Sequence, residues 1–329
     1  MQIVYVHLNS RIPIHLFMNL RRTRVMFPGQ NITLISNVNQ RIPKGIKLEI
    51  FKKGEQWYEV ENRLGHPKNF RNNFWMTSLG RFIALVEYQN KINDSILHIE
   101  SDVIISQDFP VNIFEHAVWQ ISYPILSNER GIASILFLPD KVSSNELLNE
   151  LQASSLSDPF TSDMLILGNM FRKSGAVSPL PIGPNGAENY RSFLPNHLLE
   201  RWEKDIQKFG GVFDGWDIGG FFFGTDPRNA RGRSYLQRDV PSEFSEIRKW
   251  NIKYSKSRDF IELENNNQRI PIFCLHLTSK QLSLFKVNLP SKRIINLLKV
   301  RPSEYSKFYL RIFVNQAFQS LLKRSRFSL

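Results

Sequence analysis

The chain has very few of the features that mark secreted or membrane-spanning proteins. Cys274 is the single cysteine among 329 residues, so an internal disulfide is excluded and a reducing compartment is expected. No apolar run approaches the length that crosses a bilayer. Residues 1–7 lack a basic segment followed by a long apolar stretch, so we expect a first strand there rather than a signal peptide. These absences favour a cytoplasmic protein.

Several motifs of nucleotide and metal enzymes are also missing. The sequence has no GxxxxGK loop followed by Ser or Thr, no GxGxxG, no HExxH and no CxxC pair. Each of these motifs carries a defined phosphate-binding or zinc-binding chemistry. Their absence argues against a P-loop kinase, a dinucleotide oxidoreductase, a zinc protease of the HExxH type and a zinc ribbon.

The charge balance is strongly basic. Lys and Arg number 43 against 30 Asp and Glu, which gives a formal net charge of +13. Such a surface attracts polyanions, among them nucleic acids, anionic lipids and phosphorylated substrates. From residue 291 onward the only acid is Glu304, and the basic residues there are Lys292, Arg293, Lys299, Arg301, Lys307, Arg311, Lys323, Arg324 and Arg326.

Hydrophobic patterning predicts an α/β domain. A β-branched and aromatic run at 3–8, helical spacing from Ile14 to Arg24 and a second apolar run at 32–35 give strand, helix and strand in succession. This order predicts a βαβ unit and a parallel sheet. Further elements are expected as helices at 77–91, 147–152 and 197–209, strands at 95–99, 103–105 and 134–138, and a loop at 178–195.

Residues 303–323 predict an amphipathic helix. Two neighbouring apolar rows face one polar row, and the polar row contains Lys307, Arg311, Asn315, Gln319 and Lys323. We therefore expect residues 286–329 to form a basic helical extension to a larger domain at 1–285. The apolar rows suit packing on that domain and the basic row suits anionic lipid, so both alternatives remain open.

Two acids follow the most apolar predicted strand. Glu100 and Asp102 stand between Ile96–Ile99 and 103–105, and on a continuous strand their side chains would point to the same side. Two carboxylates at the end of an apolar strand need compensation, which Mg²⁺ or Mn²⁺ supplies. Such an ion also bridges a diphosphate and neutralises charge on it as it leaves. The alternative is two acids that cap a strand at the surface.

In the middle of an α/β sequence, an apolar strand that ends in acid-x-Asp resembles the DxD motif of the GT-A glycosyltransferases. Four further segments agree in their order with bacterial capsule and lipopolysaccharide sugar transferases of that fold. They are 6–13 with His7 and Asn9, Arg81 at the start of the preceding helix, 213–229 with Asp214, Ile218, Gly224 and Asp226, and 270–280 with His276, Ser279 and Lys280.

The resemblance covers residues 1–285 and implies the GT-A fold. This fold is Rossmann-like, with a mixed, mostly parallel sheet flanked by helices. The resemblance further implies a nucleotide-sugar half at about 1–110 and an acceptor half at about 111–285 of the catalytic domain.

The resemblance also implies roles for particular residues. Asp102 is expected to bind Mn²⁺ or Mg²⁺ directly and His276 to complete the site, although a hydrogen-bonded core histidine is the alternative. Glu100 stands where Asp is usual, and its length favours a metal-bound water or the ribose. Arg81 and Lys280 would place positive charge at the diphosphate. The expected donor-binding residues are His7, Asn9, Arg81, Glu100, Ser101 and Lys280, and the expected metal ligands are Asp102, His276 and Glu100.

Three aspartates are candidates for the catalytic role near the acceptor. Asp163 precedes an apolar run, Asp217 follows Trp216, whose ring can stack on a sugar, and Asp214 precedes Gly215. An inverting enzyme needs a carboxylate base for the acceptor hydroxyl, whereas a retaining enzyme needs only a stabiliser for the sugar cation. For each of them a turn or helix-cap aspartate is the alternative, most of all for Asp214.

The sequence therefore predicts a metal-dependent transferase that moves a sugar from a nucleoside diphosphate donor to a glycan or lipid-linked hydroxyl, in cell-surface polysaccharide synthesis at the inner face of the membrane. A sugar-nucleotide nucleotidyltransferase shares the layout, but residues 7–13 lack its glycine-rich loop. A nucleic-acid-binding protein would suit the charge, yet no known RNA or DNA module is present. A transferase-like protein that binds glycans without catalysis is a third alternative.

Overall fold

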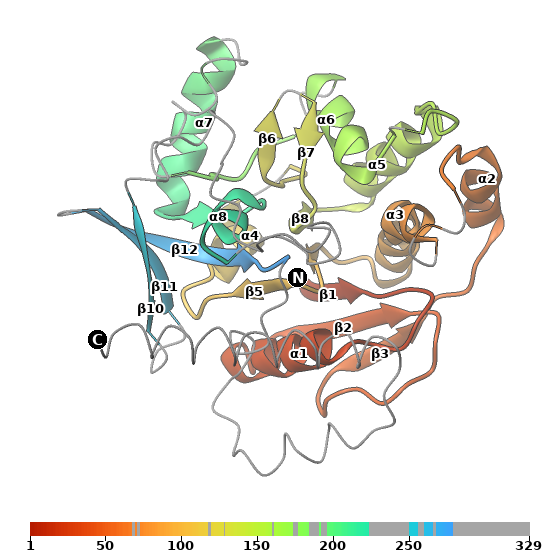
Figure 1. Ribbon diagram of the computed structural model, residues 1–329, viewed down its shortest axis with the longest axis horizontal. Helices are drawn as coiled ribbons and strands as arrows, with labels where there is room; N and C mark the ends of the chain where they lie inside the picture. Colours follow the sequence, from red (N-terminus) through yellow and green to blue (C-terminus); the bar gives the residue numbers. More distant parts are fainter. Residues whose placement is uncertain are drawn as a thin grey trace, which may run out of the picture. The chain divides into compact units, whose positions relative to one another are not determined.

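Apolar, β-branched segments build a five-stranded sheet in the computed structural model (Figure 1). Its strand order is β3-β2-β1-β4-β8, formed by Lys47–Ile50, Asn31–Ser36, Gln2–Val6, Ile96–Ile99 and Ile135–Leu138. The first four of these strands run parallel, and β8 runs antiparallel to β4. The predicted βαβ unit and the mostly parallel sheet are confirmed.

The structure describes most of the chain as far as residue 278. All described residues belong to the compact unit Met1–Phe285. The amphipathic helix predicted at 303–323 lies outside them, as do Ser279, Lys280 and most of the loop predicted at 178–195. The described residues are 1–67, 70, 73–117, 120–127, 129–159, 161–173, 177–183, 191, 196–223, 250–255, 260–265 and 268–278.

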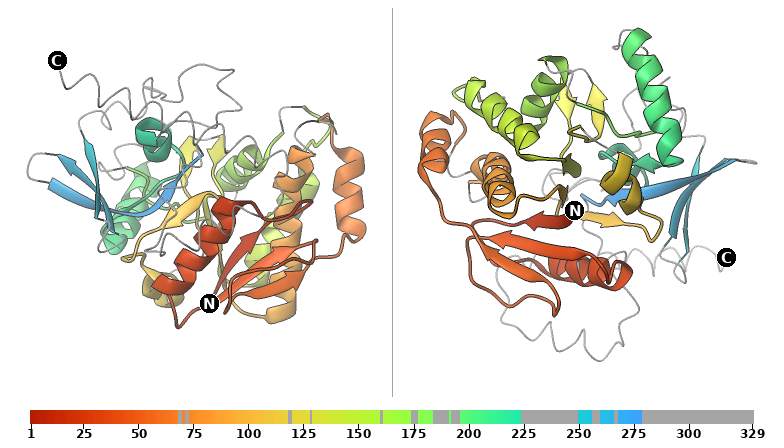
Figure 2. Two further views of the ribbon diagram at one scale, coloured as in Figure 1. Left: turned by 60° about the horizontal axis from the view of Figure 1, so that its bottom comes forward. Right: turned by 180° about the vertical axis from the view of Figure 1, so that it is seen from behind.

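Helices cover both faces of this sheet (Figure 2). Alternate side chains of each strand point to opposite sides, so the apolar side chains of both faces are buried under helices. On β1, Ile3 and Tyr5 enter one hydrophobic core with Leu16 and Leu20 of α1 (Ile14–Met26). Val4 enters the other core. That second core also receives the apolar side chains of α2 (Glu55–Arg63), α3 (Phe74–Ile92), α5 (Lys141–Ala153) and α6 (Asp163–Lys173).

Capping explains where the helices differ from their predicted ranges. Asp140 accepts a hydrogen bond from the backbone N–H of Ser143 at 2.8 Å, so α5 begins well before the predicted 147. Asn73 and Asn93 adopt left-handed conformations at the two ends of α3. The other helices are α4 (Val111–Ala117), α7 (Asn196–Phe209) and α8 (Asp217–Phe223). Among the helices described, none is long and apolar enough to span a bilayer.

A second sheet joins late and early parts of the chain. Its order is β10-β11-β12-β5, formed by Asn251–Ser255, Phe260–Asn265, Gln268–His276 and Val103–Ile105. β12 pairs antiparallel with β5, which places His276 opposite Val103, and it also pairs with β9 (Val212–Phe213). A separate small hairpin is formed by β6 (Ile125–Ser127) and β7 (Arg130–Gly131).

The chain changes sheets between β4 and β5. The strands predicted at 95–99 and 103–105 are confirmed, but residues 100–102 between them form a turn. The strand-alternation argument for Glu100 and Asp102 was therefore wrong, because β4 belongs to the first sheet and β5 to the second. This turn is the point where the two sheets meet.

Candidate metal centre

The turn at 100–102 is held by backbone hydrogen bonds on both sides. Glu100 N–H donates to Ser134 O at 3.0 Å, Val103 N–H donates to Glu100 O at 3.1 Å, and Leu277 N–H donates to Asp102 O at 2.8 Å. The last of these bonds connects the turn to the end of β12. The backbone thus fixes the two acids against the segment that carries His276.

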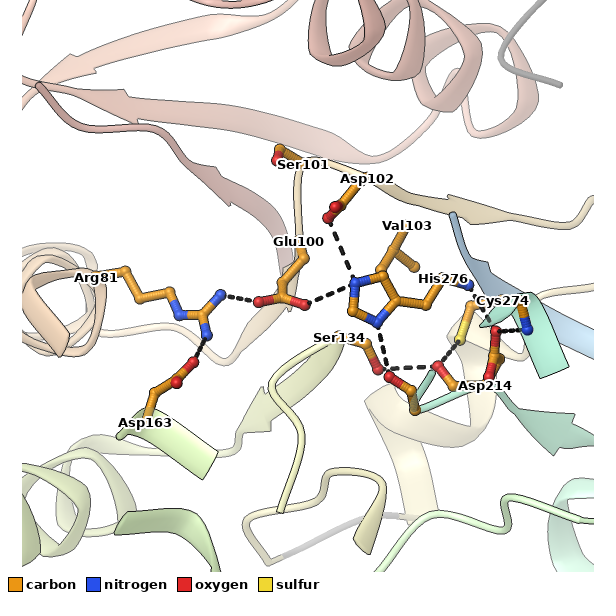
Figure 3. A network of polar contacts seen from close by, with 12 residues as sticks. Arg81, Glu100, Ser101, Asp102, Val103, Ser134, Asp163, Asp214, Cys274 and His276 are labelled. Carbon is orange, nitrogen blue, oxygen red and sulfur yellow. Dashed lines mark hydrogen bonds and ion pairs between the residues drawn. The ribbon is translucent and has the colours of Figure 1, made fainter. Parts of the chain in front are cut away.

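Three side chains converge on one point beside this turn (Figure 3). His276 Nε2 lies 3.5 Å from Glu100 Oε2 and 3.5 Å from Asp102 Oδ1. Each of the three residues offers one potential ligand atom, and these three atoms all lie within 4.8 Å of one another. We call Glu100, Asp102 and His276 the acid–histidine cluster. Its spacing suits a single cation.

A hydrogen bond on the side away from the two carboxylates fixes the orientation of the His276 ring. Its Nδ1 lies 2.7 Å from Gly215 O, and since a carbonyl only accepts, Nδ1 carries the hydrogen. Nε2 therefore faces the two carboxylates, either protonated or with its lone pair available. A backbone carbonyl that fixes the tautomer in this way is a common support for metal-binding histidines.

The two carboxylates keep a proton on the imidazole of His276. Burial acts to lower the pKa, but the charge and hydrogen bond of Asp102, followed by the charge of Glu100, outweigh it and raise the pKa to about 9. At neutral pH the ring of the metal-free protein is an imidazolium held between two acids. A divalent cation held by Asp102 and His276 would have to displace this proton.

This raised pKa predicts a pH-dependent stability in the absence of metal. The contribution of His276 is fully present below its ordinary pKa of 6.5 and is lost as the pH rises through about 9. In EDTA, the wild type should lose roughly 3 kcal/mol of unfolding free energy across this window relative to His276→Gln. Urea unfolding of both proteins at pH 6 and pH 9.5 measures the difference. An equal change in unfolding free energy for the wild type and His276→Gln would contradict the raised pKa of His276.

Arg81 links the cluster to a third acid. Its guanidinium bonds Glu100 through Nη1 and Asp163 through Nη2, and the three side chains are 12%, 16% and 12% exposed. Burial opposes the charge of Arg81, but Glu100 and Asp163 outweigh it, so the pKa of Arg81 is raised. The sequence analysis placed Arg81 at the donor and Asp163 at the acceptor, and it did not predict that they pair.

The charges of these five groups do not balance without a cation. Three carboxylates against the guanidinium and the imidazolium leave one negative charge, and they leave two when His276 gives up its proton. A divalent ion brings the group to neutrality, which favours its binding at a mostly buried site. The residues present therefore fit a divalent metal in number, spacing and charge.

Asp214 anchors the element behind His276. Its two carboxylate oxygens accept backbone N–H bonds from Ile218 at 3.0 Å, Gly219 at 2.8 Å and His276 at 2.9 Å. Burial raises the pKa of this carboxyl despite the opposing charge of His276 and these bonds. Both carboxylate oxygens of Asp214 therefore hold α8 against β12.

Gly219 allows α8 to approach β12 closely. A Cβ at this position would come within 1.9 Å of His276 O and 2.8 Å of Asp214 Oδ2. Gly219→Ala should therefore displace His276 and weaken metal binding by about 10-fold or more, since support of a ligand from behind is worth 10–100-fold. Isothermal titration with Mn²⁺ checks this, and Gly29→Ala, which meets nothing within 4 Å, is the control.

The loop after β1, which carries the predicted donor-binding residues His7 and Asn9, is held by side-chain hydrogen bonds. His7 Nε2 lies 2.9 Å from Ser10 Oγ, and burial lowers the pKa of this ring to about 4, so it is neutral. Asn9 has a φ of 65° and exchanges hydrogen bonds with Asn37.

The other predicted site residues lie elsewhere. Asp217 is buried at the start of α8, and Ser101 lies within the acidic turn. Lys280 lies outside the described residues.

Comparison with known proteins gives structural likeness only. No protein-family model and no curated protein matches the sequence. The galactosyltransferase LgtC, solved with donor and acceptor sugar analogues, is 15% identical over 63% of this chain and 84% of its own, with a TM-score of 0.41. GlyE of Streptococcus pneumoniae TIGR4 is 17% identical over 54% of this chain and 44% of its own, with a TM-score of 0.36.

A third solved structure is a glycosyltransferase involved in glycosylation of the major capsid of PBCV-1. It is 10% identical over 54% of this chain and 81% of its own, with a TM-score of 0.31. The chain is thus similar to several glycosyltransferases over a little more than half of its length. Likeness of this degree does not assign a function, which has to come from the acid–histidine cluster itself.

Proposed function

We propose that the protein is a metal-dependent glycosyltransferase that uses a nucleoside diphosphate sugar. The observation that carries this proposal is the acid–histidine cluster, which unites two carboxylates and an oriented imidazole at the junction of two sheets. A divalent cation held there would neutralise charge on the diphosphate leaving group. Asp102 and His276 would be its direct ligands, with Glu100 steadied by Arg81.

The ligand set favours Mn²⁺ over Mg²⁺. Carboxylate oxygens suit both ions, but Mg²⁺ demands near-ideal octahedral oxygen coordination and keeps several waters. An imidazole nitrogen suits softer first-row metals, and Mn²⁺ accepts oxygen and nitrogen together. An imidazole beside two carboxylates is therefore the reason to propose Mn²⁺ ahead of Mg²⁺.

The sheet order supports donor binding beside the cluster. β1 and β4 are parallel neighbours, so the loop after β1 and the acidic turn after β4 lie at the same edge. In open α/β sheets, ligands bind outside the carboxyl ends of the strands. We therefore propose that His7, Asn9 and Ser101 contact the nucleotide and that Lys280 meets the diphosphate.

The acceptor side is proposed from the remaining acids. Asp163 is fixed by its ion pair with Arg81, which lies between it and the cluster. A carboxylate held in this way can orient a hydroxyl or stabilise positive charge on a sugar. Asp163 and Asp217 are the candidates for that role, whereas Asp214 has a supporting one.

A donor screen tests the proposal. The full chain is mixed with a panel of sugar nucleotides and Mn²⁺, and nucleoside diphosphate release and thermal stabilisation are measured. Slow hydrolysis of one donor, lost in EDTA, is the expected result. Release of pyrophosphate would instead identify a nucleotidyltransferase, and glycan binding without turnover of any donor would identify a binding protein.

We further propose a glycan or lipid-linked acceptor of cell-surface polysaccharide synthesis, reached at the inner face of the membrane. The nine basic residues after 290 supply charge that anionic lipid attracts. The full chain should sediment with vesicles that contain phosphatidylglycerol but not with neutral phosphatidylcholine vesicles, and this binding should weaken with salt. Equal sedimentation with both vesicles would contradict an electrostatic contact.

A further inference from the structure

Two polar side chains of α1 are fully buried beneath the acidic turn. Asn19 and Arg22 are each 0% exposed, and they lie three residues apart, on one side of the helix. Their helix neighbours Leu16 and Leu20 pack in the same core as Val103 and Ile105. Buried amide and guanidinium groups need hydrogen-bond partners, so their positions identify what α1 supports.

Their partners are backbone carbonyls of the turn and of β5. Asn19 Nδ2 donates to Val103 O at 2.6 Å and, more weakly, to Ser101 O at 3.4 Å. Arg22 donates to Ile105 O from Nε at 3.3 Å and from Nη2 at 3.2 Å. The carbonyls of Val103 and Ile105 lie on one edge of β5, and that of Ser101 precedes them in the turn.

The opposite edge of the same segment pairs with β12. Leu277 N–H donates to Asp102 O there, while Asn19 holds the peptides before and after it from the other side. α1 thus supplies, through two side chains, the bonds that a neighbouring strand would supply. The residue between the two carbonyls that Asn19 bonds is Asp102.

We propose that Asn19 is a positioning residue for the metal centre. Its amide holds the carbonyls of the two residues that flank Asp102, so that the carboxylate stays beside His276 before a cation arrives. This role rests on the proposed function in one respect, namely that a cation binds at Asp102. Without the amide, the buried carbonyl of Val103 and the part-buried carbonyl of Ser101 lose this donor and the turn gains freedom, so a preorganised ligand geometry is lost.

Gln89 offers a matched control elsewhere in the domain. It is also 0% exposed, and its Nε2 donates to two backbone carbonyls, of Leu138 at 2.9 Å and of Asp94 at 3.1 Å. Asn19→Leu and Gln89→Met each replace one buried bridging amide with an apolar side chain. Only the first of them touches the acidic turn.

Two measurements are made on the wild type and both variants. Hydrogen exchange of the metal-free proteins reports the freedom of residues 100–106, and titration with Mn²⁺, followed by electron paramagnetic resonance of the free ion, reports the affinity. Asn19→Leu should exchange faster at 100–106 and bind Mn²⁺ 10–100-fold more weakly. Gln89→Met should lose comparable thermal stability and keep wild-type Mn²⁺ affinity.

Unchanged exchange at 100–106 and unchanged affinity in Asn19→Leu would overturn the role of Asn19, as would an equal loss of affinity in Gln89→Met. If Asn19→Leu does not fold, Asn19→Ala is measured instead, since it removes the amide without adding bulk. A wild type that binds no Mn²⁺ would overturn the proposed function, while the metal-free exchange would still decide whether Asn19 holds the turn.

Discussion

Replacing Asp102 with asparagine is expected to lower sugar transfer by about 10³-fold, which corresponds to roughly 4 kcal/mol of transition-state stabilisation. Asp102 Oδ1 lies 3.5 Å from His276 Nε2, and the neutral amide removes one of the two charges that face the imidazole. The backbone of this residue is held by Leu277 N–H, so the fold should survive. Steady-state kinetics with and without added Mn²⁺ measure the effect.

Asp140→Asn is the matched control for this variant. The Asp140→Asn substitution removes the same charge, but at the start of α5. Asparagine caps helices as well as aspartate does, so the helix should keep its stability. It should keep wild-type activity. Activity of Asp102→Asn within a few-fold of the wild type, with unaltered Mn²⁺ dependence, would remove Asp102 from the metal site.

Replacing Arg81 with methionine is expected to destabilise the protein by about 3–5 kcal/mol, the range for removing one partner of a buried ion pair. The guanidinium is bonded to Glu100 and Asp163, and all three side chains are less than one-fifth exposed, at 12%, 16% and 12%. Without it, two carboxylates remain close together with no cation between them. Chemical denaturation at pH 7 in EDTA measures the loss.

Two companion variants separate charge from geometry. Arg81→Lys keeps the charge but cannot bond both acids in a fork, so it should lose less stability than Arg81→Met. Asp163→Asn in the Arg81→Met background should recover part of the loss, because it removes one of the unpaired charges. A loss below about 1 kcal/mol in Arg81→Met would show that these pairs do not hold α3 to α6.

The parallel sheet was predictable because its signal is local. The β-branched runs, the helix after Pro13 and the second strand lie close together in sequence, and the structure confirms their βαβ arrangement. The second sheet was not predictable, because β5 and β12 are separated by about half of the chain. Periodicity identifies a strand but not its distant partner.

In the candidate site, too, local features were predictable and contacts between distant segments were not. Glu100 and Asp102 were singled out as a pair, but the argument assumed a strand where the structure has a turn. The resemblance placed His276 at the same site, and the structure brings it beside both acids because β12 pairs with β5, a pairing that periodicity does not reveal. Their roles as metal ligands stay predictions.

Other contacts depend on folding of distant segments. The pairing of Arg81 with Asp163 joins two helices, and no spacing in the sequence indicates it. Asn19 and Arg22 did leave a signal, since both interrupt the apolar side of α1 at helical spacing. Polar residues at such positions deserve inspection as supports for a neighbouring backbone.

The location of a bound cation tests the central claim most directly. Crystals of the full chain grown with Mn²⁺ and a nucleoside diphosphate, measured at the manganese absorption edge, would show where the ion lies. The account predicts one anomalous peak within coordination distance of Asp102 and His276 Nε2, with phosphate oxygens on its open side. Manganese bound only elsewhere, with this cluster ordered and empty of metal, would contradict it.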